Sequence, residues 1–287
     1  MVHKNVAEQL AMMQIVYDTF TPMRSKDSVH VYRVLGCGVS FVLKYFENES
    51  DRREIENYRI LSSLSVPTIK LIAHTDSALL MEDIEQSAMY RLGVKADLND
   101  EAIAAQIAKW YKQLHDEGRD FIASHGVGLY DETDVITEKN VEYIITKTNT
   151  AGNPAWDVLR AGFPMIKKRI AQAERTLTYN DFYFTNLIVA KDLSSALMFD
   201  YNLLGKGYMY ADIRNVCSSL SERAKAAFLC EYGGFSGEEA LIDDVASVLT
   251  TLFFGCKRAE FPAWALEALE RVHNGDLLKA LNNLLYL

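Results

Sequence analysis

Apolar residues near the N-terminus fall into two short stretches that are rich in β-branched and aromatic side chains. These stretches run from Val29 to Val34 and from Ser40 to Phe46. Both compositions favour β-strands, and the segment between them supplies Gly36 and Gly38 for a turn. The pattern therefore predicts a β-hairpin with these two glycines as turn residues.

The hairpin is followed by a segment with the apolar spacing of a helix. An amphipathic helix is predicted from about Asp51 to Leu64, and it ends before Pro67 because a proline disfavours helix in the residue that precedes it. Two further short apolar runs follow, from Ile69 to Ala73 and from Ala78 to Met81. The order strand, strand, helix, strand, strand indicates a small lobe of mixed α and β structure.

Beyond Glu82-Asp83-Ile84 the apolar positions are mostly at helical spacing. From Asn99 to Gly118 they form one stripe, as expected of an amphipathic helix that Asn99 caps and Gly118 ends. The stripe consists of Ile103, Ile107, Trp110, Tyr111 and Leu114. Helical spacing is also found from Asp157 to Arg175 and from Tyr210 to the C-terminus.

Together these patterns predict an α+β fold with two lobes. A small N-terminal lobe built on an antiparallel sheet would cover residues 1–85, and a larger, mainly helical C-terminal lobe would cover residues 86–287. The hinge between them is expected at about residues 82–88. A chain of 287 residues is near the size at which one hydrophobic core gives way to two, so two lobes are reasonable.

The formal net charge of −9 narrows the classes of partner. Nucleic acids and anionic membranes bind basic surfaces, so neither is expected here, whereas cationic small molecules are compatible with this charge. No apolar run reaches the roughly 18 residues of a membrane span, and Glu8 and Gln9 interrupt the N-terminus where a signal peptide needs apolar residues. Four scattered cysteines without a CxxC pair indicate reduced thiols and no zinc. We therefore expect a cytoplasmic protein.

The candidate chemistry lies around a second predicted strand pair. Leu187 to Val189 and Ala196 to Phe199 are joined by a short polar connection of the length that folds two strands antiparallel. Asn186 precedes the first strand and Asp200 follows the second, so the hairpin would place their oxygens about one strand spacing, roughly 5 Å, apart. Such a pair of oxygens suits Mg²⁺, which takes one or two protein ligands beside waters and phosphates.

Asp181 lies five residues before Asn186, on the loop that leads into this hairpin. It could face the same point without binding the metal and could then act as a base. The spacing DxxxxN, followed by a hairpin and an aspartate, is the arrangement that kinase-type phosphoryl transfer requires. The alternative is structural, because Asp and Asn also form turns at the entrance of a hairpin.

The stretches LTYNDFYFTNLIV and ALMFDYNLLGKGYMYADIRNV resemble the signature region of the aminoglycoside phosphotransferase and choline kinase superfamily. The resemblance extends over nearly the whole chain and implies a bilobal, protein-kinase-like fold whose N-terminal lobe binds nucleotide. It implies an enzyme that moves the γ-phosphoryl group of ATP, or of another nucleoside triphosphate, to a hydroxyl of a small molecule. Asp181 would be the catalytic base, and Asn186 and Asp200 would bind Mg²⁺.

The N-terminal segments resemble the nucleotide-binding parts of the same superfamily. SFVLKYF is similar to the strand with the phosphate-binding lysine, here Lys44, and REIENYRILSS to the helix with the glutamate that pairs with it, here Glu54. ALLMEDIE is similar to the hinge, where the backbone of Glu82, Asp83 and Ile84 would hydrogen-bond adenine. Taken alone, Lys44 could be a solvated strand lysine and Glu54 part of a wet helix face.

Two features depart from the superfamily pattern. Tyr179 replaces its histidine, and a phenol that bonds nearby backbone is one substitute for a residue that is usually architectural. The nucleotide-covering loop, expected around Thr19 to Ser28, contains no glycine for a close backbone approach to phosphate. A looser grip on the nucleotide, or a preference for another nucleoside triphosphate, follows as a hypothesis.

The acceptor stays open at this level. Aromatic residues near Asp181 could bind a quaternary amine by cation–π contacts, as in choline kinases, or could simply pack. Asp243 and Asp244 are expected on a solvent-facing helix surface, and Ser236 and Glu239 form a capping box. The alternatives to a kinase of small, cationic or aminoglycoside-like metabolites are a choline/ethanolamine-type kinase, a regulatory pseudokinase that binds nucleotide, and an interaction domain.

Overall fold

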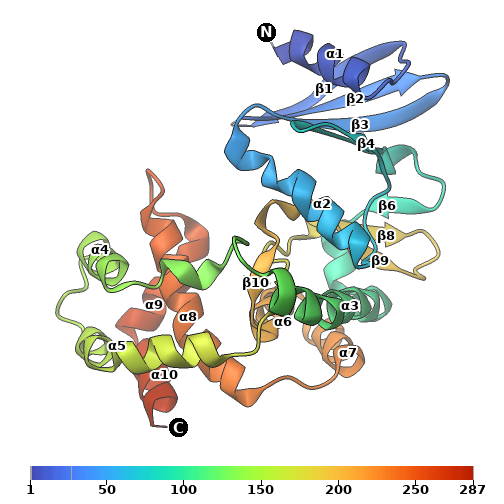
Figure 1. The fold of residues 1–287 in the computed structure, drawn as a ribbon. Helices are drawn as coiled ribbons and strands as arrows, with labels where there is room; N and C mark the ends of the chain where they lie inside the picture. The colour runs from blue at the N-terminus through green and yellow to red at the C-terminus, as the bar shows by residue number, and fades with distance from the viewer. Residues whose placement is uncertain (1, 27, 287) are drawn as a thin grey trace. The chain divides into compact units, whose positions relative to one another are not determined.

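The computed structural model describes residues 2–26 and 28–286, which form two compact units (Figure 1). Unit 1 consists of Met1–Gly118, Tyr179–Leu204 and Asn215–Gly233, and unit 2 of Arg119–Thr178, Gly205–Arg214 and Gly234–Leu287. These units are defined by contacts within the folded chain. The expected division into lobes of residues 1–85 and 86–287 stays a prediction.

Unit 1 contains a five-stranded antiparallel sheet in the order β1-β2-β3-β5-β4. The strands are β1 (Thr19–Lys26), β2 (Val29–Gly36), β3 (Val39–Phe46), β4 (Leu71–His74) and β5 (Ala78–Glu82). The predicted hairpin is therefore confirmed as β2 and β3. Its turn is formed by Cys37 and Gly38, whose φ angles of 52° and 76° are both positive, as a two-residue type I′ turn requires.

One face of this sheet packs against α1 (Val2–Met12), which the apolar pattern did not predict. Val6 and Leu10 of α1 are fully buried in a core whose other members come from β2, β3 and β5. The helix α2 (Arg53–Ser63) lies on the opposite side of the sheet in Figure 1. The sheet therefore has an α1 face that forms a core and a second face that is available for other contacts.

The remainder of unit 1 contains a three-stranded sheet in the order β6-β8-β9 and the helices that accompany it. Its strands are β6 (Tyr90–Leu92), β8 (Leu187–Ala190) and β9 (Ala196–Met198), and its helices include α3 (Glu101–His125) and α7 (Glu222–Tyr232). The helix predicted from Asn99 is confirmed as α3, but it continues past Gly118 to His125. The predicted cap, Asn99, is wrong: the first turn is capped by Asp100, whose side chain accepts hydrogen bonds from the N–H groups of Ala102 and Ile103 at 2.8 and 3.0 Å.

Unit 2 is mainly helical and has its own core. Buried residues of α5 and α8, including Trp156 and Leu249, pack with those of α4, α9 and α10. The elements are α4 (Glu138–Thr148), α5 (Pro154–Gln172), α8 (Gly237–Cys256), α9 (Leu266–His273) and α10 (Asp276–Leu285), with the short strands β7 (Thr176–Thr178) and β10 (Gly205–Gly207). Helix α6 (Met209–Ser219) has residues in both units.

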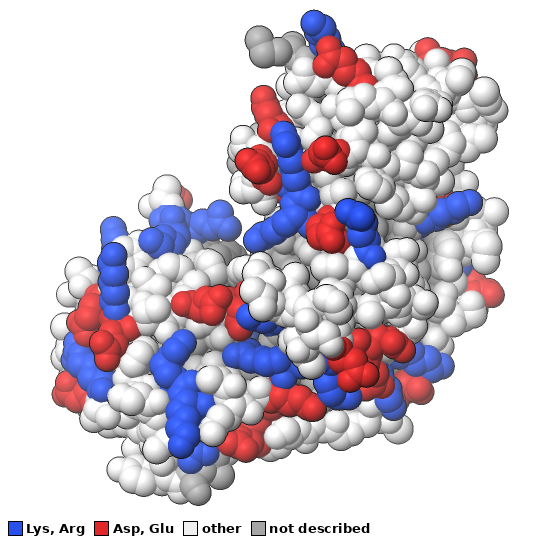
Figure 2. Space-filling view, in the orientation of Figure 1, with Lys and Arg blue, Asp and Glu red and all other residues white. Residues whose placement is uncertain are grey.

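The structure confirms the predicted α+β class, because a five-stranded antiparallel sheet is combined with a largely helical remainder. Among the residues that the structure describes, no helix has the length and apolar character needed to cross a membrane. On the face shown in Figure 2, acidic and basic side chains are interspersed, so that this face carries both signs of charge.

Candidate active site

The hairpin of β8 and β9 brings the two predicted metal ligands to the same edge. Leu187 pairs with Met198, and the N–H of Phe199 donates to the carbonyl of Asn186 at 3.0 Å. Asn186 therefore faces the residue that immediately precedes Asp200. Asp200 has φ 64° and ψ 68°, a left-handed conformation that aspartate tolerates better than most residues, and it turns the chain out of the strand.

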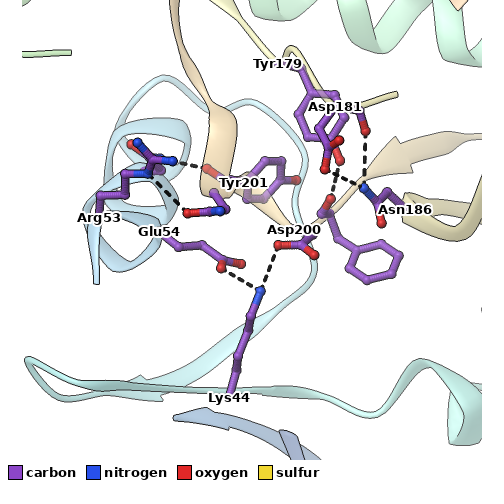
Figure 3. Close-up of polar contacts among 11 residues, drawn as sticks. Lys44, Arg53, Glu54, Tyr179, Asp181, Asn186, Asp200 and Tyr201 are labelled. Atoms are coloured by element: carbon purple, nitrogen blue, oxygen red, sulfur yellow. Dashed lines mark hydrogen bonds and ion pairs between the residues drawn. The ribbon is translucent and has the colours of Figure 1, made fainter. Parts of the chain in front are cut away.

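Asp181 is held against the same hairpin by the side chain of Asn186. The amide nitrogen of Asn186 donates to the carboxylate Oδ2 of Asp181 at 3.1 Å and to its backbone carbonyl at 3.2 Å. Figure 3 shows both side chains beside Asp200. Burial, helped by the charge of Asp200, raises the pKa of Asp181 to about 6, although the bond from Asn186 and the charge of Lys44 oppose the shift. A carboxylate with this pKa is ionised at neutral pH and can accept a proton.

Lys44 on β3 joins two carboxylates from distant parts of the chain. Its ammonium lies 2.6 Å from Oε2 of Glu54 and 2.8 Å from Oδ1 of Asp200 (Figure 3). Glu54 is only 1% exposed, which excludes the wet helix face that was one interpretation of this residue. Burial alone would lower the pKa of Lys44, but the two carboxylates outweigh it and raise the pKa. Lys44 is therefore a permanent cation between Glu54 and Asp200.

Helix α2 is fixed to the segment that follows Asp200. The amide of Asn57 donates to the carbonyl of Tyr201 at 2.7 Å, and Nε of Arg53 donates to Oδ1 of Asn202 at 3.1 Å. The rings of Tyr58 and Tyr201 pack edge to face at 4.7 Å. These contacts place Glu54 at a defined distance from the hairpin. Local sequence patterns do not predict these contacts; the one signal is that Asn57 lies three residues after Glu54, on the same helix face.

A cavity of about 590 Å³ opens beside these groups. Lys44, Glu54 and Asp200 line it, and so do residues of the predicted hinge, including Glu82, Asp83 and Ile84. Its volume is within the range of 300–1,000 Å³ that is common for small-molecule sites. The structure thus brings six of the eight predicted site residues to one cavity, and the remaining two, Asp181 and Asn186, lie beside Asp200.

The hinge residue Asp83 has a structural use for its side chain. This carboxylate is 2% exposed and accepts hydrogen bonds from Nε of Arg33 at 2.8 Å, from Oγ of Ser40 at 2.6 Å and from the N–H of Glu85 at 3.2 Å. The N–H of Glu82 donates to the carbonyl of Lys70 at 3.0 Å. The side chain of Asp83 therefore fixes the segment after β5 to β2 and β3.

Tyr179, the residue that departs from the superfamily pattern, is fully buried. Its hydroxyl donates to the carbonyl of Phe199, next to Asp200, and its ring packs against Trp110, Tyr111 and Tyr201 at centroid distances of 5.7, 6.3 and 6.0 Å. The phenol thus bonds nearby backbone, as the sequence allowed. Since the side chain of Tyr179 is enclosed by these rings, it supports the loop of Asp181 and does not offer a surface to a ligand.

The aromatic residues near Asp181 divide into two groups. Phe182 and Tyr201 are 5% and 0% exposed, which supports packing over cation–π contact for these two. Tyr183 is 56% exposed, so its ring is accessible for a cation–π contact with a ligand. Burial therefore leaves Tyr183 as the aromatic side chain that a ligand could reach most readily among these three.

In unit 2 the expectation that Asp243 faces solvent is wrong. Asp243 is 2% exposed, and its carboxylate pairs with Nε of Arg214 at 2.7 Å and accepts from the hydroxyl of Tyr208 at 3.1 Å. The partly exposed guanidinium of Arg214, on another helix, explains why this acidic residue is found inside. Asp244, in contrast, is half exposed and lies 3.3 Å from Arg271. The Ser236 half of the predicted capping box is confirmed, because Oγ of Ser236 accepts from the N–H of Glu239 at the third helical position of α8. The carboxylate of Glu239 accepts from the N–H of Tyr210 at 3.1 Å.

The donors at the hairpin fit a magnesium ion better than a transition metal. Among the described residues, no group of three or more His, Cys, Asp or Glu side chains could hold a metal. The available oxygens are a carboxylate at Asp200 and an amide at Asn186, whose nitrogen, not its oxygen, makes the bonds to Asp181. Mg²⁺ commonly takes one or two protein oxygens and completes its shell with waters and phosphates.

The chain is similar to known phosphotransferases in sequence pattern and in fold. The model of the family described as "Phosphotransferase enzyme family" matches residues 19–244 of the chain. No curated protein matches the chain in sequence. The choline kinase LicA from Streptococcus pneumoniae is 13% identical, with a TM-score of 0.64 over 98% of this chain and 99% of that one. The apoenzyme of the macrolide 2′-phosphotransferase MphH from Brachybacterium faecium is 16% identical, with a TM-score of 0.60 over 97% and 98% of the two chains.

A third solved structure, an ethanolamine kinase from Plasmodium vivax, is 14% identical, with a TM-score of 0.59 over 91% of this chain and 84% of that one. At these identities the likeness concerns the fold. The predicted kinase-like fold is confirmed, since the chain shares it with phosphotransferases of different specificity.

Proposed function

The chain belongs to the phosphotransferase enzyme family and is a small-molecule kinase with a hydroxyl group as acceptor, and from this premise we propose that its phosphoryl donor is ATP or another nucleoside triphosphate, used with Mg²⁺. The cavity beside Lys44 would hold the nucleotide, with the base against the backbone of Glu82, Asp83 and Ile84. This position leaves the phosphates near Lys44 and Asp200.

A single observation carries this proposal. Lys44, Glu54 and Asp200 come from β3, α2 and the turn after β9, and all three line one cavity. Carboxylate oxygens of Glu54 and Asp200 lie 2.6 and 2.8 Å from the ammonium of Lys44. Glu54 is buried from solvent, and its carboxylate holds the ammonium of Lys44 in one place. A fixed cation beside a carboxylate at a hairpin edge is suited to the negative charge of a phosphoryl donor.

Each group then has a chemical role. Asp181, whose pKa is raised to about 6, would orient the acceptor hydroxyl and take its proton. Asn186 and Asp200 would hold Mg²⁺, which when bound neutralises charge on the phosphates. Lys44 would bind phosphate oxygens while Glu54 keeps its side chain extended across the cavity wall. The chain supplies positioning and charge, which is most of what phosphoryl transfer demands of a protein.

We propose a small hydroxyl compound with a cationic group as the acceptor. The formal charge of −9 favours such a compound, and the phosphotransferases of this fold include kinases of choline and ethanolamine and enzymes that modify macrolides and spectinomycin. A panel of these compounds, with amino sugars and nucleosides added, covers the chemistry to be tested. Tyr183, with its exposed ring near Asp181, is a candidate contact for a quaternary amine.

The test combines binding with turnover. Nucleotide binding is measured by calorimetry with and without Mg²⁺, and release of ADP is measured across the acceptor panel. Asp181→Asn should lower kcat by about 10²–10⁴-fold, the usual contribution of a general base, and should leave the Kd for ATP within about threefold. Asp192→Asn, on the exposed turn between β8 and β9, removes an aspartate outside the site and should leave kcat unchanged. Full activity of Asp181→Asn would refute the assigned role of Asp181.

A further inference from the structure

Two basic side chains line the cavity but have no role in the site described above. Arg24 and Lys26 lie on β1, are exposed, and contribute to the cavity wall. Neither side chain forms an ion pair or a hydrogen bond with any other residue that the structure describes. Lys44, the third basic side chain on this wall, is already engaged by two carboxylates. The side chains of Arg24 and Lys26 are therefore cations without a counter-ion among residues 2–26 and 28–286.

The register of the sheet places Arg24 in line with Lys44. Arg24 stands opposite Val31 on β2, and Val31 stands opposite Lys44 on β3. Side chains of directly opposed residues lie on the same face, so these three form one row across the sheet. Strands are about 4.8 Å apart, which separates the backbones at Arg24 and Lys44 by roughly 10 Å. A short valine between them leaves room for a ligand above the row.

A second row runs parallel to the first. Lys26 stands opposite Val29, and Val29 stands opposite Phe46 on β3. The ammonium of Lys44 lies 5.6 Å from the centre of the Phe46 ring, so the two rows converge at that end. The second row adds another cation to the same face, again separated from β3 by a valine.

A β-bulge is the reason that these cations are on the cavity face. The pairing of β1 with β2 shifts between Pro22 and Arg24, which makes Met23 an extra residue. Without the bulge, Met23 would pair with Val31, and Arg24 would stand opposite His30 on the face that packs against α1. A shift by one residue moves every later side chain of the strand to the other face. The bulge thus turns the end of β1 toward the cavity.

We propose that Arg24 and Lys26 bind the phosphate chain of the nucleotide with their side chains. This inference rests on the proposed function. The segment around β1 has no glycine, so it cannot offer closely approaching backbone N–H groups as a glycine-rich loop does. Even with Mg²⁺ bound at Asn186 and Asp200, the carboxylates of Glu54 and Asp200 offset much of the positive charge at Lys44 and the metal, so further cations would strengthen the binding of a triphosphate. A guanidinium and an ammonium supply these, the guanidinium with a fork that matches phosphate oxygens.

The experiment measures the Kd of three probes by calorimetry: ATP, inorganic tripolyphosphate and adenosine. The variant is Arg24→Gln/Lys26→Gln, and the matched control is Lys109→Gln/Lys112→Gln, which removes two exposed positive charges from α3 in the same unit. The Kd of the Arg24/Lys26 variant for ATP should rise about tenfold, since two solvent-facing charge-assisted contacts are lost, while that for adenosine should change less than twofold. The difference should shrink as salt is raised.

The outcomes separate this inference from the function on which it rests. Unchanged ATP and tripolyphosphate affinity in the Arg24/Lys26 variant, with turnover by the wild type, overturns the role of the two cations and leaves the proposed function standing. A wild type that binds neither ATP nor any other nucleoside triphosphate overturns the proposed function. In that case, loss of tripolyphosphate binding in the variant still supports an anion site at Arg24 and Lys26, and equal or absent binding by wild type and variant refutes it. An equal loss in the Lys109/Lys112 control would reduce the effect to net charge and also refute it.

Discussion

Replacing Lys44 by methionine removes the charge that joins Glu54 to Asp200 while keeping most of the side-chain volume. Glu54 is then left as a carboxyl that is 1% exposed and has lost its ammonium partner at 2.6 Å. Removing one member of a buried ion pair is costly when the other must stay charged. Glu54 can instead keep a proton, so the loss of stability in this variant should depend on pH.

The magnitude follows from the titration of Glu54. Burial raises the pKa of Glu54 from 4.5 to about 7, against the opposing charge of Lys44, and removal of Lys44 raises it further. The pKa of Glu54 is higher in the folded than in the unfolded protein, so the folded state binds this proton more tightly and is stabilised by it at low pH. This stabilisation is lost by about 1.4 kcal/mol per pH unit as pH rises from the unfolded pKa to the folded pKa. In the wild type this loss ends near pH 7, whereas in the variant it continues. The variant should therefore lose up to about 2 kcal/mol more at pH 8.5 than at pH 6.

The assay is urea unfolding at pH 6.0 and pH 8.5, without Mg²⁺ or nucleotide, because a bound ligand would add its own stabilisation. The double variant Lys44→Met/Glu54→Gln removes the titrating carboxyl. Its loss relative to the wild type should be smaller at pH 8.5 than at pH 6.0, by about 1.4 kcal/mol, because the wild type itself loses that much stability between pH 6 and pH 7. Lys109→Met controls for the loss of one exposed lysine. A Lys44→Met variant whose loss is the same at both pH values, or larger at pH 6, would contradict the assignment of Glu54 as the buried group that Lys44 keeps ionised.

Three further outcomes follow from the site. Below about pH 6 the value of kcat/KM should fall about tenfold per pH unit, because Asp181 must be ionised to accept a proton and its pKa is raised to about 6. A profile that stays flat down to about pH 4.5 would contradict the role of Asp181 as the base. Tyr179→Phe should lower the free energy of unfolding by about 1–2 kcal/mol, because the carbonyl of Phe199 loses its hydrogen-bond donor; thermal unfolding measures this. A turnover assay should show kcat within severalfold of the wild type. Asn57→Ala should lower the free energy of unfolding by about 1–3 kcal/mol, measured by urea unfolding, because the buried carbonyl of Tyr201 loses the amide donor at 2.7 Å. A change below about 0.5 kcal/mol would show that this hydrogen bond is dispensable.

Local patterns were sufficient for most regular elements. The hairpin of β2 and β3 could be predicted because its strand composition and its turn glycine lie within one short stretch. The site hairpin was predictable for the same reason, since Asn186 and Asp200 flank two strands that are neighbours in sequence. In both cases the interactions that decide the structure are short in range along the chain.

Elements without such a pattern were missed. β1 is exposed along nearly its whole length and contains Pro22, so it lacks the apolar alternation by which a strand is recognised. It forms because β2 offers it a ladder of hydrogen-bonding partners. Asp243 was misplaced for a related reason, since the residue that makes its burial tolerable, Arg214, lies on another helix.

The sequence by itself determined the fold class, the order of most strands and helices, and the kinds of side chain available for phosphoryl transfer. The tertiary structure decided which charges share a cavity, because Lys44 and Asp200 are 156 residues apart and meet only when the sheet and the hairpin are assembled. It also decided which face of β1 carries Arg24 and Lys26, since one bulged residue reverses that face. Coulomb attraction and desolvation depend on distances of a few ångströms and on burial, and these exist only in the folded chain.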